Sequence, residues 1–321
     1  TLFVDLAGEL SDAFLVGLET DCGIVELGLL NLVFAPDYSV SKKFYTFHSE
    51  LEEEAVVDFT TMPDGIDAHH VSVVTEWQVL AEAAGSITSL SSRELLRVAQ
   101  PQSNNNGGGM AFDAQGALLI GFGDGGGVGD QDQTIEFGGS VIGQTRGHLT
   151  GNASDLGNPL GSVIRIEPGG ANSANGQYGI PVDNPFFAED GKVAEIFAYG
   201  FRNPNSITLD GQIDALVVDF GEVAIDEVNK LVDGKDYGWN RVEGGYNYLL
   251  NGLDPSYLSS KTTAGPNELA PLLDIDRRLG RELILDSSEV DSSPFDSKSS
   301  GVIFDWLVGI RDSPALEMEA P

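Results

Sequence analysis

Short apolar runs separated by glycine constrain the fold of this chain more than any other feature. Of its 321 residues, 40 are glycine and 14 are proline, and they stand between the runs rather than in one linker. Many runs alternate apolar and polar residues or are rich in β-branched residues, as half-buried strands are. The clearest runs are residues 2–6, 24–34, 43–47, 70–79, 117–122, 162–166, 193–199, 215–220 and 302–307. The pattern predicts an all-β protein.

Helical periodicity is scarce in this sequence. Only residues 76–84 and 271–285 have a spacing that permits a helix. Many short strands with glycine-rich turns are typical of a sandwich, a barrel or a propeller. At roughly 40–50 residues for each four-stranded blade, the length favours a single propeller domain of about six blades.

The charge balance narrows the choice of partners. Fifty acidic residues against seventeen basic ones give a formal net charge of −33. Such a chain repels phosphate, so nucleic acid and anionic membranes are poor partners. Cations, calcium above all, or a basic protein are favoured, although the same composition also suits a solvated surface in salty water. No run of 18 apolar residues occurs, so we expect no transmembrane helix.

Cysteine usage and the first residues say little about the compartment. Cys22 is the only cysteine, so no disulfide can form within the chain. Residues 1–5 lack the charged and apolar regions of a secretory signal. We therefore expect any signal to have been removed or to lie outside this sequence.

Four segments, in a fixed order along the chain, contain residues that could bind a ligand or take part in catalysis. They are residues 26–38, 105–126, 199–204 and 226–239. In the third, Arg202 follows an expected strand and a proline fixes the turn after it, so the planar guanidinium can point at a carboxylate or quinone oxygen. An ordinary surface ion pair is the alternative.

The second segment runs into a glycine-rich stretch, residues 121–127, which is not a phosphate cradle because no lysine and no helix follow it. Its glycines let the backbone approach a ligand closely. The irregular stretch that continues to residue 159 either borders a site or is a mobile surface insertion. Within it, Asp130 and Asp132 fit calcium loosely or belong to a hydrated acidic loop.

Together, these four segments resemble the glucose/sorbosone dehydrogenase family, whose members are six-bladed β-propellers that use pyrroloquinoline quinone and calcium. The resemblance is specific from about residue 26 to residue 245. Residues 246–321 diverge from the family and are expected to form the closing blades of four-stranded antiparallel sheets. Residues 2–6 are the candidate strand that closes the ring.

The resemblance implies a set of cofactor and metal ligands. Arg202 and Asn203 would lie over the quinone, with Glu26 beside it. The carbonyl groups of Gly221 and Glu222 would face the calcium that clamps the cofactor, although the family often has an uncharged residue in place of Glu222.

A second, structural calcium is implied farther along the chain. Glu227 and the carbonyl of Tyr237 would hold it by resemblance to the family. Tyr237 and Trp239 are equally well explained as core aromatic residues of a blade.

The catalytic base is the point at which this chain departs from the family. Asn105 stands where the family usually carries a histidine, and an amide cannot take the proton that leaves a sugar hydroxyl. Asp124, which matches the family's aspartate near the pocket, or Glu26 is an alternative base if partly buried. His148 is a further candidate, whereas the histidines at residues 69–70 are expected at the surface or in packing.

Two functions stay open at this stage. The first is a secreted, calcium-dependent oxidoreductase that resembles the quinone-dependent aldose dehydrogenases and passes electrons from a small sugar or alcohol to a separate acceptor. The second is a catalytically inactive, calcium-stabilised propeller that binds a protein partner in an extracellular assembly. The resemblance implies an extracellular or periplasmic location in both cases. Arg277, Arg278 and Arg281 either grip the cofactor's carboxylates or balance acidic neighbours.

Overall fold

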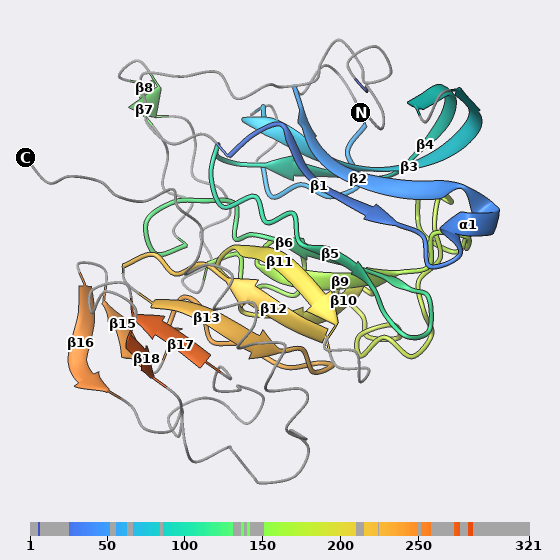
Figure 1. The fold of residues 1–321 in the computed structure, drawn as a ribbon. Helices are drawn as coiled ribbons and strands as arrows, with labels where there is room; N and C mark the ends of the chain where they lie inside the picture. Colours follow the sequence, from blue (N-terminus) through green and yellow to red (C-terminus); the bar gives the residue numbers. More distant parts are fainter. Residues whose placement is uncertain are drawn as a thin grey trace, which may run out of the picture.

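The computed structural model (Figure 1) describes most of the first 257 residues and two later strands. The described parts are Leu6 and residues 26–51, 56–62, 67–83, 86–130, 136–137, 140–141, 151–209, 215–223, 225–244, 246–249, 252–257, 273–276 and 282–284. They form antiparallel sheets with one four-residue helix, α1 (Tyr38–Ser41). The all-β prediction is confirmed.

The first sheet has the strand order β1-β2-β3-β4, which is also the order along the chain. Its strands are β1 (Leu29–Phe34), β2 (Lys43–Glu50), β3 (His70–Ala83) and β4 (Ser86–Gln100). The indole N–H of Trp77 on β3 donates to Thr46 Oγ1 on β2 at 2.8 Å.

The second and third sheets follow in chain order. The second has the order β10-β9-β6-β5, and the third has the order β11-β12-β13-β17-β18. The second contains β5 (Met110–Phe112), β6 (Leu118–Phe122), β9 (Ser162–Ile166) and β10 (Ile196–Tyr199). The third contains β11 (Pro204–Leu209), β12 (Ala215–Asp219), β13 (Ile225–Lys230), β17 (Leu273–Asp276) and β18 (Glu282–Ile284).

Two smaller sheets complete the described structure. One joins β14 (Val242–Glu243), β15 (Tyr246–Leu249) and β16 (Gly252–Tyr257), and the other pairs β7 (Glu136–Phe137) with β8 (Ser140–Val141).

Both segments for which the spacing permitted a helix contain strands, so that prediction was wrong. Residues 76–83 belong to β3, which pairs with β2 on one side and with β4 on the other. Residues 273–276 and 282–284 are the paired strands β17 and β18. Cross-strand pairing overrides the weak helix preference of such residues. The expected strand at 302–307, and all of the one at 2–6 except Leu6, lie outside the described residues.

The strand that comes first in each of the three larger sheets lies at an edge of that sheet. β1 contacts β5, and β11 contacts both β5 and β6. Successive antiparallel sheets that meet through their first strands are typical of the blades of a β-propeller. The first strands of neighbouring sheets therefore approach one another, and the loops beside them share a common centre.

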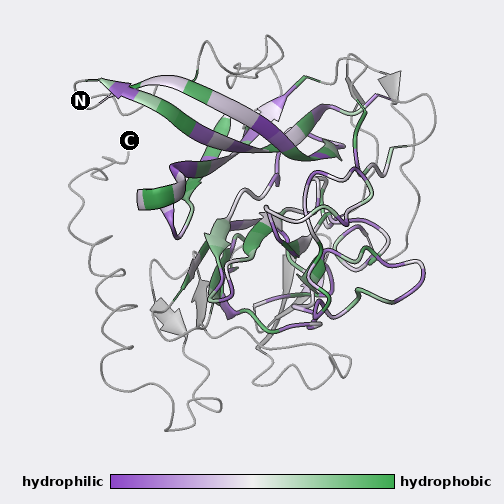
Figure 2. Ribbon diagram, turned by 90° about the vertical axis from the view of Figure 1, so that its right-hand side faces the viewer, coloured by the Kyte–Doolittle hydropathy of each residue, from purple (hydrophilic) through white to green (hydrophobic). Residues whose placement is uncertain are grey.

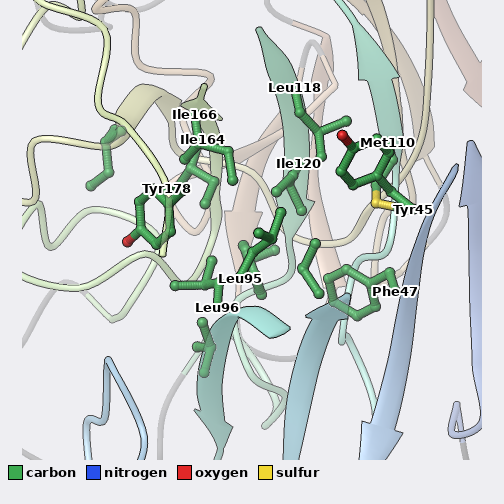
Figure 3. Close-up of a cluster of buried hydrophobic side chains, with 14 of the residues drawn as sticks. Tyr45, Phe47, Leu95, Leu96, Met110, Leu118, Ile120, Ile164, Ile166 and Tyr178 are labelled. Atoms are coloured by element: carbon green, nitrogen blue, oxygen red, sulfur yellow. The ribbon is translucent and has the colours of Figure 1, made fainter. Parts of the chain in front are cut away.

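The sheets pack through apolar faces on both sides. All five residues of β6 are buried. Leu118 and Ile120 join the cluster that includes Tyr45 and Phe47 of the first sheet, as Figure 3 shows. Phe122 belongs to the same cluster. Leu119 faces the opposite way, into a second cluster with residues of the third sheet. This packing fixes the spacing of the loops that connect the sheets.

Residue hydropathy alternates along the long strands, as expected when successive side chains point to opposite faces of a sheet. Figure 2 shows hydrophobic and hydrophilic residues alternating along the long strands of the first sheet. In the described part of the chain, no helix is long and apolar enough to cross a membrane.

Candidate functional site

Asp219, at the end of β12, holds the turn that carries the arginine–asparagine pair. Its Oδ2 accepts the backbone N–H of Arg202 at 3.0 Å, and its Oδ1 accepts the backbone N–H of Asn203 at 2.6 Å. Burial, together with the nearby charge of Glu227, raises the pKa of Asp219 to about 8. The two N–H donors oppose this rise in the pKa of Asp219. They also fix the backbone positions from which the side chains of Arg202 and Asn203 project.

The side chain of Asn203 joins three parts of the chain. Its Oδ1 accepts the backbone N–H of Gly107 at 2.9 Å, and its Nδ2 donates to Glu26 Oε2 at 3.2 Å. Asn203 itself is buried. The segments that precede β1, β5 and β11 therefore meet at this amide.

Asn105 lies next to the same carboxylate. Its backbone has φ of 55°, a left-handed conformation that asparagine tolerates better than most residues. Its N–H donates to Glu26 Oε2 at 2.9 Å, and its side-chain Nδ2 donates to Asp124 Oδ1 at 2.9 Å. The residue that stands at the family's histidine position is thus a buried donor to a carboxylate.

Asp124 is fully buried and both of its carboxylate oxygens are engaged. Besides the Asn105 amide, Oδ1 accepts the N–H of Gly126 at 2.9 Å, and Oδ2 accepts the indole N–H of Trp239 at 2.7 Å. Burial raises the pKa of Asp124 to about 7, although the charge of Arg202 and the three donors oppose the rise.

Glu26 differs from Asp124 in exposure and in free hydrogen-bonding capacity. It is half-buried, and its Oε2 accepts both the Asn105 and the Asn203 donors. Among the described residues, no donor contacts its Oε1. Glu26 therefore keeps one carboxylate oxygen available to a ligand, which Asp124 does not.

The guanidinium of Arg202 is tied to the turn that follows β12. Its Nη1 donates to the carbonyl oxygens of Phe220 and Gly221, at 3.1 Å each. The guanidinium carbon lies 5.7 Å from the centre of the Trp239 ring. Its Nε is buried without a hydrogen-bond acceptor among the described residues and lies 3.9 Å from Glu222 Oε2. One N–H of the arginine is thus left for an acceptor oxygen.

The side chain of Glu222 takes part in the site, although only its backbone carbonyl was expected to do so. Its Oε2 accepts the N–H of Gly129 at 2.9 Å and the hydroxyl of Tyr248 at 3.2 Å. The ring of Tyr248 also packs edge-on against Trp239, with 4.8 Å between the ring centres. Glu222 therefore links the glycine-rich loop to the arginine.

The two residues expected at the structural calcium site do lie together. Glu227 and Tyr237 line one cavity of about 10 Å³, and Asp219 and Glu243 line it with them. This volume suits one water molecule or one ion. In the part of the chain that the structure describes, no three His, Cys, Asp or Glu side chains converge as metal ligands, so a cation here would depend on backbone carbonyls.

Tyr237 also has the core role that was its alternative. Its ring stacks on Phe201 at 4.4 Å between centres, and its hydroxyl donates to the carbonyl of Lys230.

The structure describes only some of the remaining sequence candidates. His70 is fully buried in the first sheet, where burial lowers its pKa to about 3, so packing is its role. Asp130 is buried and accepts the N–H groups of Asn152 and Ala153, so it does not belong to a hydrated loop. His148, Asp132 and the arginines at 277, 278 and 281 lie outside the described residues.

Sequence reasoning missed the contacts of two aromatic side chains at the site. Trp239 was expected to be a core residue with a backbone role, yet its N–H is a donor to Asp124. Tyr248 had no expected role. The Tyr-Gly-Trp run at 237–239 drew attention to Trp239, but nothing local indicates which carboxylate its indole meets.

Comparison with known proteins finds a family and several relatives that this chain resembles. The family model described as glucose/sorbosone dehydrogenase matches residues 20–266. The aldose sugar dehydrogenase YliI of Escherichia coli is 28% identical over 222 residues, which cover 69% of this chain and 48% of that protein. The human Hedgehog-interacting protein is 25% identical over 221 residues, which cover 66% of this chain and 28% of that protein.

Among solved structures, the soluble aldose sugar dehydrogenase of Escherichia coli in its apo-form superposes with a TM-score of 0.52 at 25% identity. The match covers 78% of this chain and 58% of that one. The chain thus spans about half the length of its Escherichia coli relative.

Proposed function

Because this chain belongs to the glucose/sorbosone dehydrogenase family, we propose that it is an oxidoreductase of the aldose dehydrogenase type, built on a six-bladed β-propeller. It oxidises a hydroxyl group of a small sugar or alcohol and delivers the electrons to a separate acceptor outside the cytoplasm. The observation that carries the proposal is the hydrogen-bonded group of Glu26, Asn105, Asp124 and Asn203. This hydrogen-bonded group brings polar side chains from loops beside separate sheets into direct contact.

Pyrroloquinoline quinone is the cofactor that we propose for this site. The buried Nε of Arg202 lacks an acceptor among the described residues, and a quinone or carboxylate oxygen would supply one. The backbone of Arg202 and Asn203 is held by Asp219, so the arginine is positioned before any ligand binds. When bound, the quinone supplies the two-electron acceptor for the hydride that leaves the hydroxyl-bearing carbon of the substrate.

Glu26 is the residue that we assign to proton removal. As the C–H bond of the substrate breaks, its hydroxyl group must lose a proton, which leaves a C=O product. Glu26 Oε1 is the carboxylate oxygen in the group with no contacting donor among the described residues, whereas both oxygens of Asp124 are engaged. Asn105 then serves as a donor that orients both carboxylates.

Calcium is proposed for one of its two expected positions. The cavity beside Glu227 and Tyr237 is ion-sized, and because both carboxylate oxygens of Glu227 already accept N–H groups, a structural calcium there would be held by backbone carbonyls such as that of Tyr237. The clamp position does not fit, because the Gly221 carbonyl already accepts an N–H of Arg202. No step of the proposed reaction depends on a calcium there.

The test is a titration of the calcium-loaded protein with pyrroloquinoline quinone by calorimetry, followed by dye reduction with a panel of aldoses and polyols. Saturable binding with turnover supports the proposed function. Binding without turnover contradicts the assignment of Glu26 as a base that replaces the histidine. Absence of binding excludes the quinone enzyme.

A second candidate function is a protein-binding propeller without catalysis. Two observations favour it: Asn105 replaces the base, and acidic side chains, Asp219, Glu222, Glu227 and Glu243 among them, surround the single guanidinium of Arg202. The human relative, the Hedgehog-interacting protein, suggests the same class of role. Calcium-dependent stabilisation without quinone binding would support this candidate over the enzyme.

A further inference from the structure

We propose that the guanidinium of Arg202 takes the place of the calcium that the family resemblance assigns to the turn at residues 221–222. In this chain an arginine, and not a divalent ion, is then the cation between the turn and the ligand. The inference rests on the proposed function only in taking this cleft as the cofactor site. The calcium content that it predicts is measured without any cofactor.

The first support is the way the turn's carbonyl groups are used. Nη1 of Arg202 lies 3.1 Å from the carbonyl oxygen of Phe220 and 3.1 Å from that of Gly221. One N–H-bearing nitrogen thus bridges two consecutive carbonyls. Of these two carbonyls, that of Gly221 is one of the pair that the resemblance assigns to calcium, and it already faces the arginine.

The second support is that an aromatic ring and a carboxylate lie beside the guanidinium. The guanidinium carbon lies over the Trp239 ring, at 5.7 Å from the ring centre, which is a favourable distance for a cation. Glu222 supplies a carboxylate 3.9 Å from Nε. Glu222 is in turn fixed by the N–H of Gly129 and the hydroxyl of Tyr248, so its position does not depend on the arginine.

The third support is the rigidity of the turn itself. The carboxylate of Glu243 accepts the N–H groups of Val223 and Ile225 on the far side of the turn. At Gly221, an added Cβ would lie 1.8 Å from the carbonyl oxygen of Ile225, so this position admits no side chain without movement. The carbonyls cannot easily turn away from the arginine to serve a second cation.

A calcium ion at the same oxygens would meet two obstacles. Two cations that share the Gly221 oxygen repel each other, and the arginine cannot lose its proton to relieve the repulsion. Calcium also requires six to eight oxygen ligands, and no three carboxylate or imidazole side chains converge within the described structure. The guanidinium needs only the two carbonyls and the nearby carboxylate.

The consequence concerns ligand recognition. A guanidinium offers directional N–H donors in a plane, whereas calcium offers an undirected charge. The unpartnered Nε of Arg202 selects a ligand oxygen that lies in the guanidinium plane. A ligand held in this way does not depend on a calcium ion at this position.

The test measures the number of calcium ions that each chain binds. Metal-free protein is titrated with calcium alone and followed by calorimetry. The chains compared are the wild type, Arg202→Met and the control Arg241→Met. Arg241 forms an ion pair with Asp236, so the control also removes one arginine charge from an ion pair with a carboxylate. We expect Arg202→Met to bind one calcium more than the wild type, and Arg241→Met to bind the same number as the wild type.

Equal calcium counts in the wild type and Arg202→Met would overturn the proposal, as would an equal gain in the control. Circular dichroism shows whether each variant folds, and Arg202→Gln provides a second variant without the charge if Arg202→Met does not. Since no quinone enters the titration, a negative result leaves the proposed function standing. A failed quinone titration likewise leaves the calcium counts interpretable.

Discussion

The indole N–H of Trp239 donates to Asp124 Oδ2 at 2.7 Å and joins two residues that lie 115 positions apart in the chain. The indole face of the same residue lies under the guanidinium of Arg202. Trp239 therefore fixes a carboxylate with its edge and a cation with its face. Asp124 and Arg202 are therefore both positioned by one side chain.

Trp239→Phe should destabilise the protein by about 1–3 kcal/mol, because it removes one N–H donor from a buried carboxylate and keeps the aromatic face. Urea denaturation measures the change. The matched control is Trp77→Phe, which removes an indole donor from the neutral hydroxyl of Thr46. We expect a smaller loss there, of about 1 kcal/mol. Equal losses would mean that the charge of Asp124 is unimportant.

The stability of the protein should fall between about pH 4 and pH 7 through Asp124. In the unfolded chain this carboxyl has its ordinary pKa, and burial raises the folded value to about 7. The folded state thus binds the proton more tightly. Its contribution is complete below pH 4 and is lost as the pH rises through 7, by up to about 4 kcal/mol.

Chemical denaturation at a series of pH values tests this dependence in the wild type and in Asp124→Asn. The variant should show a shallower decline over the same pH range. Glu189→Gln removes a charge from an exposed side chain and controls for general repulsion among the acidic residues. Parallel curves for the wild type and Asp124→Asn would refute the assignment.

Glu26→Gln should lower kcat for aldose oxidation by roughly 10²–10⁴-fold and leave quinone affinity within a few-fold of the wild type. The amide oxygen of glutamine can still accept the donors of Asn105 and Asn203, so the geometry is kept while the base is lost. Stopped-flow reduction and calorimetry separate the two effects. An unchanged kcat would exclude Glu26 as the proton acceptor.

Gly123→Ala should destabilise the fold by about 3 kcal/mol or more, because the new Cβ would lie 1.9 Å from the carbonyl oxygen of Asn105. The strands on both sides would have to separate. Gly169→Ala is the control, since a Cβ there meets nothing within 4 Å. Thermal unfolding compares the two variants, and a similar melting temperature for both would show that the Asn105 loop is free to move.

Much of the site could be predicted from local sequence. The run at 201–204 indicated an arginine held by a turn, and the resemblance to the family placed Asp124 near a pocket. Strands such as 162–166 were bounded correctly because their β-branched residues are buried on both faces. The helix permitted at 76–84 was wrong because pairing with β2 and β4 decides the conformation there.

By itself, the sequence determined the family and the all-β class, since the family is carried by short motifs and the class by the strand period, and it proposed residues for the site. Only the tertiary structure decided which atoms meet. The contact of Glu26 with Asn203 spans 177 positions, and the contact of Arg202 with the Gly221 carbonyl depends on how two loops face each other. Such pairings depend on how whole sheets pack, and this packing cannot be predicted from the local spacing of residues along the chain.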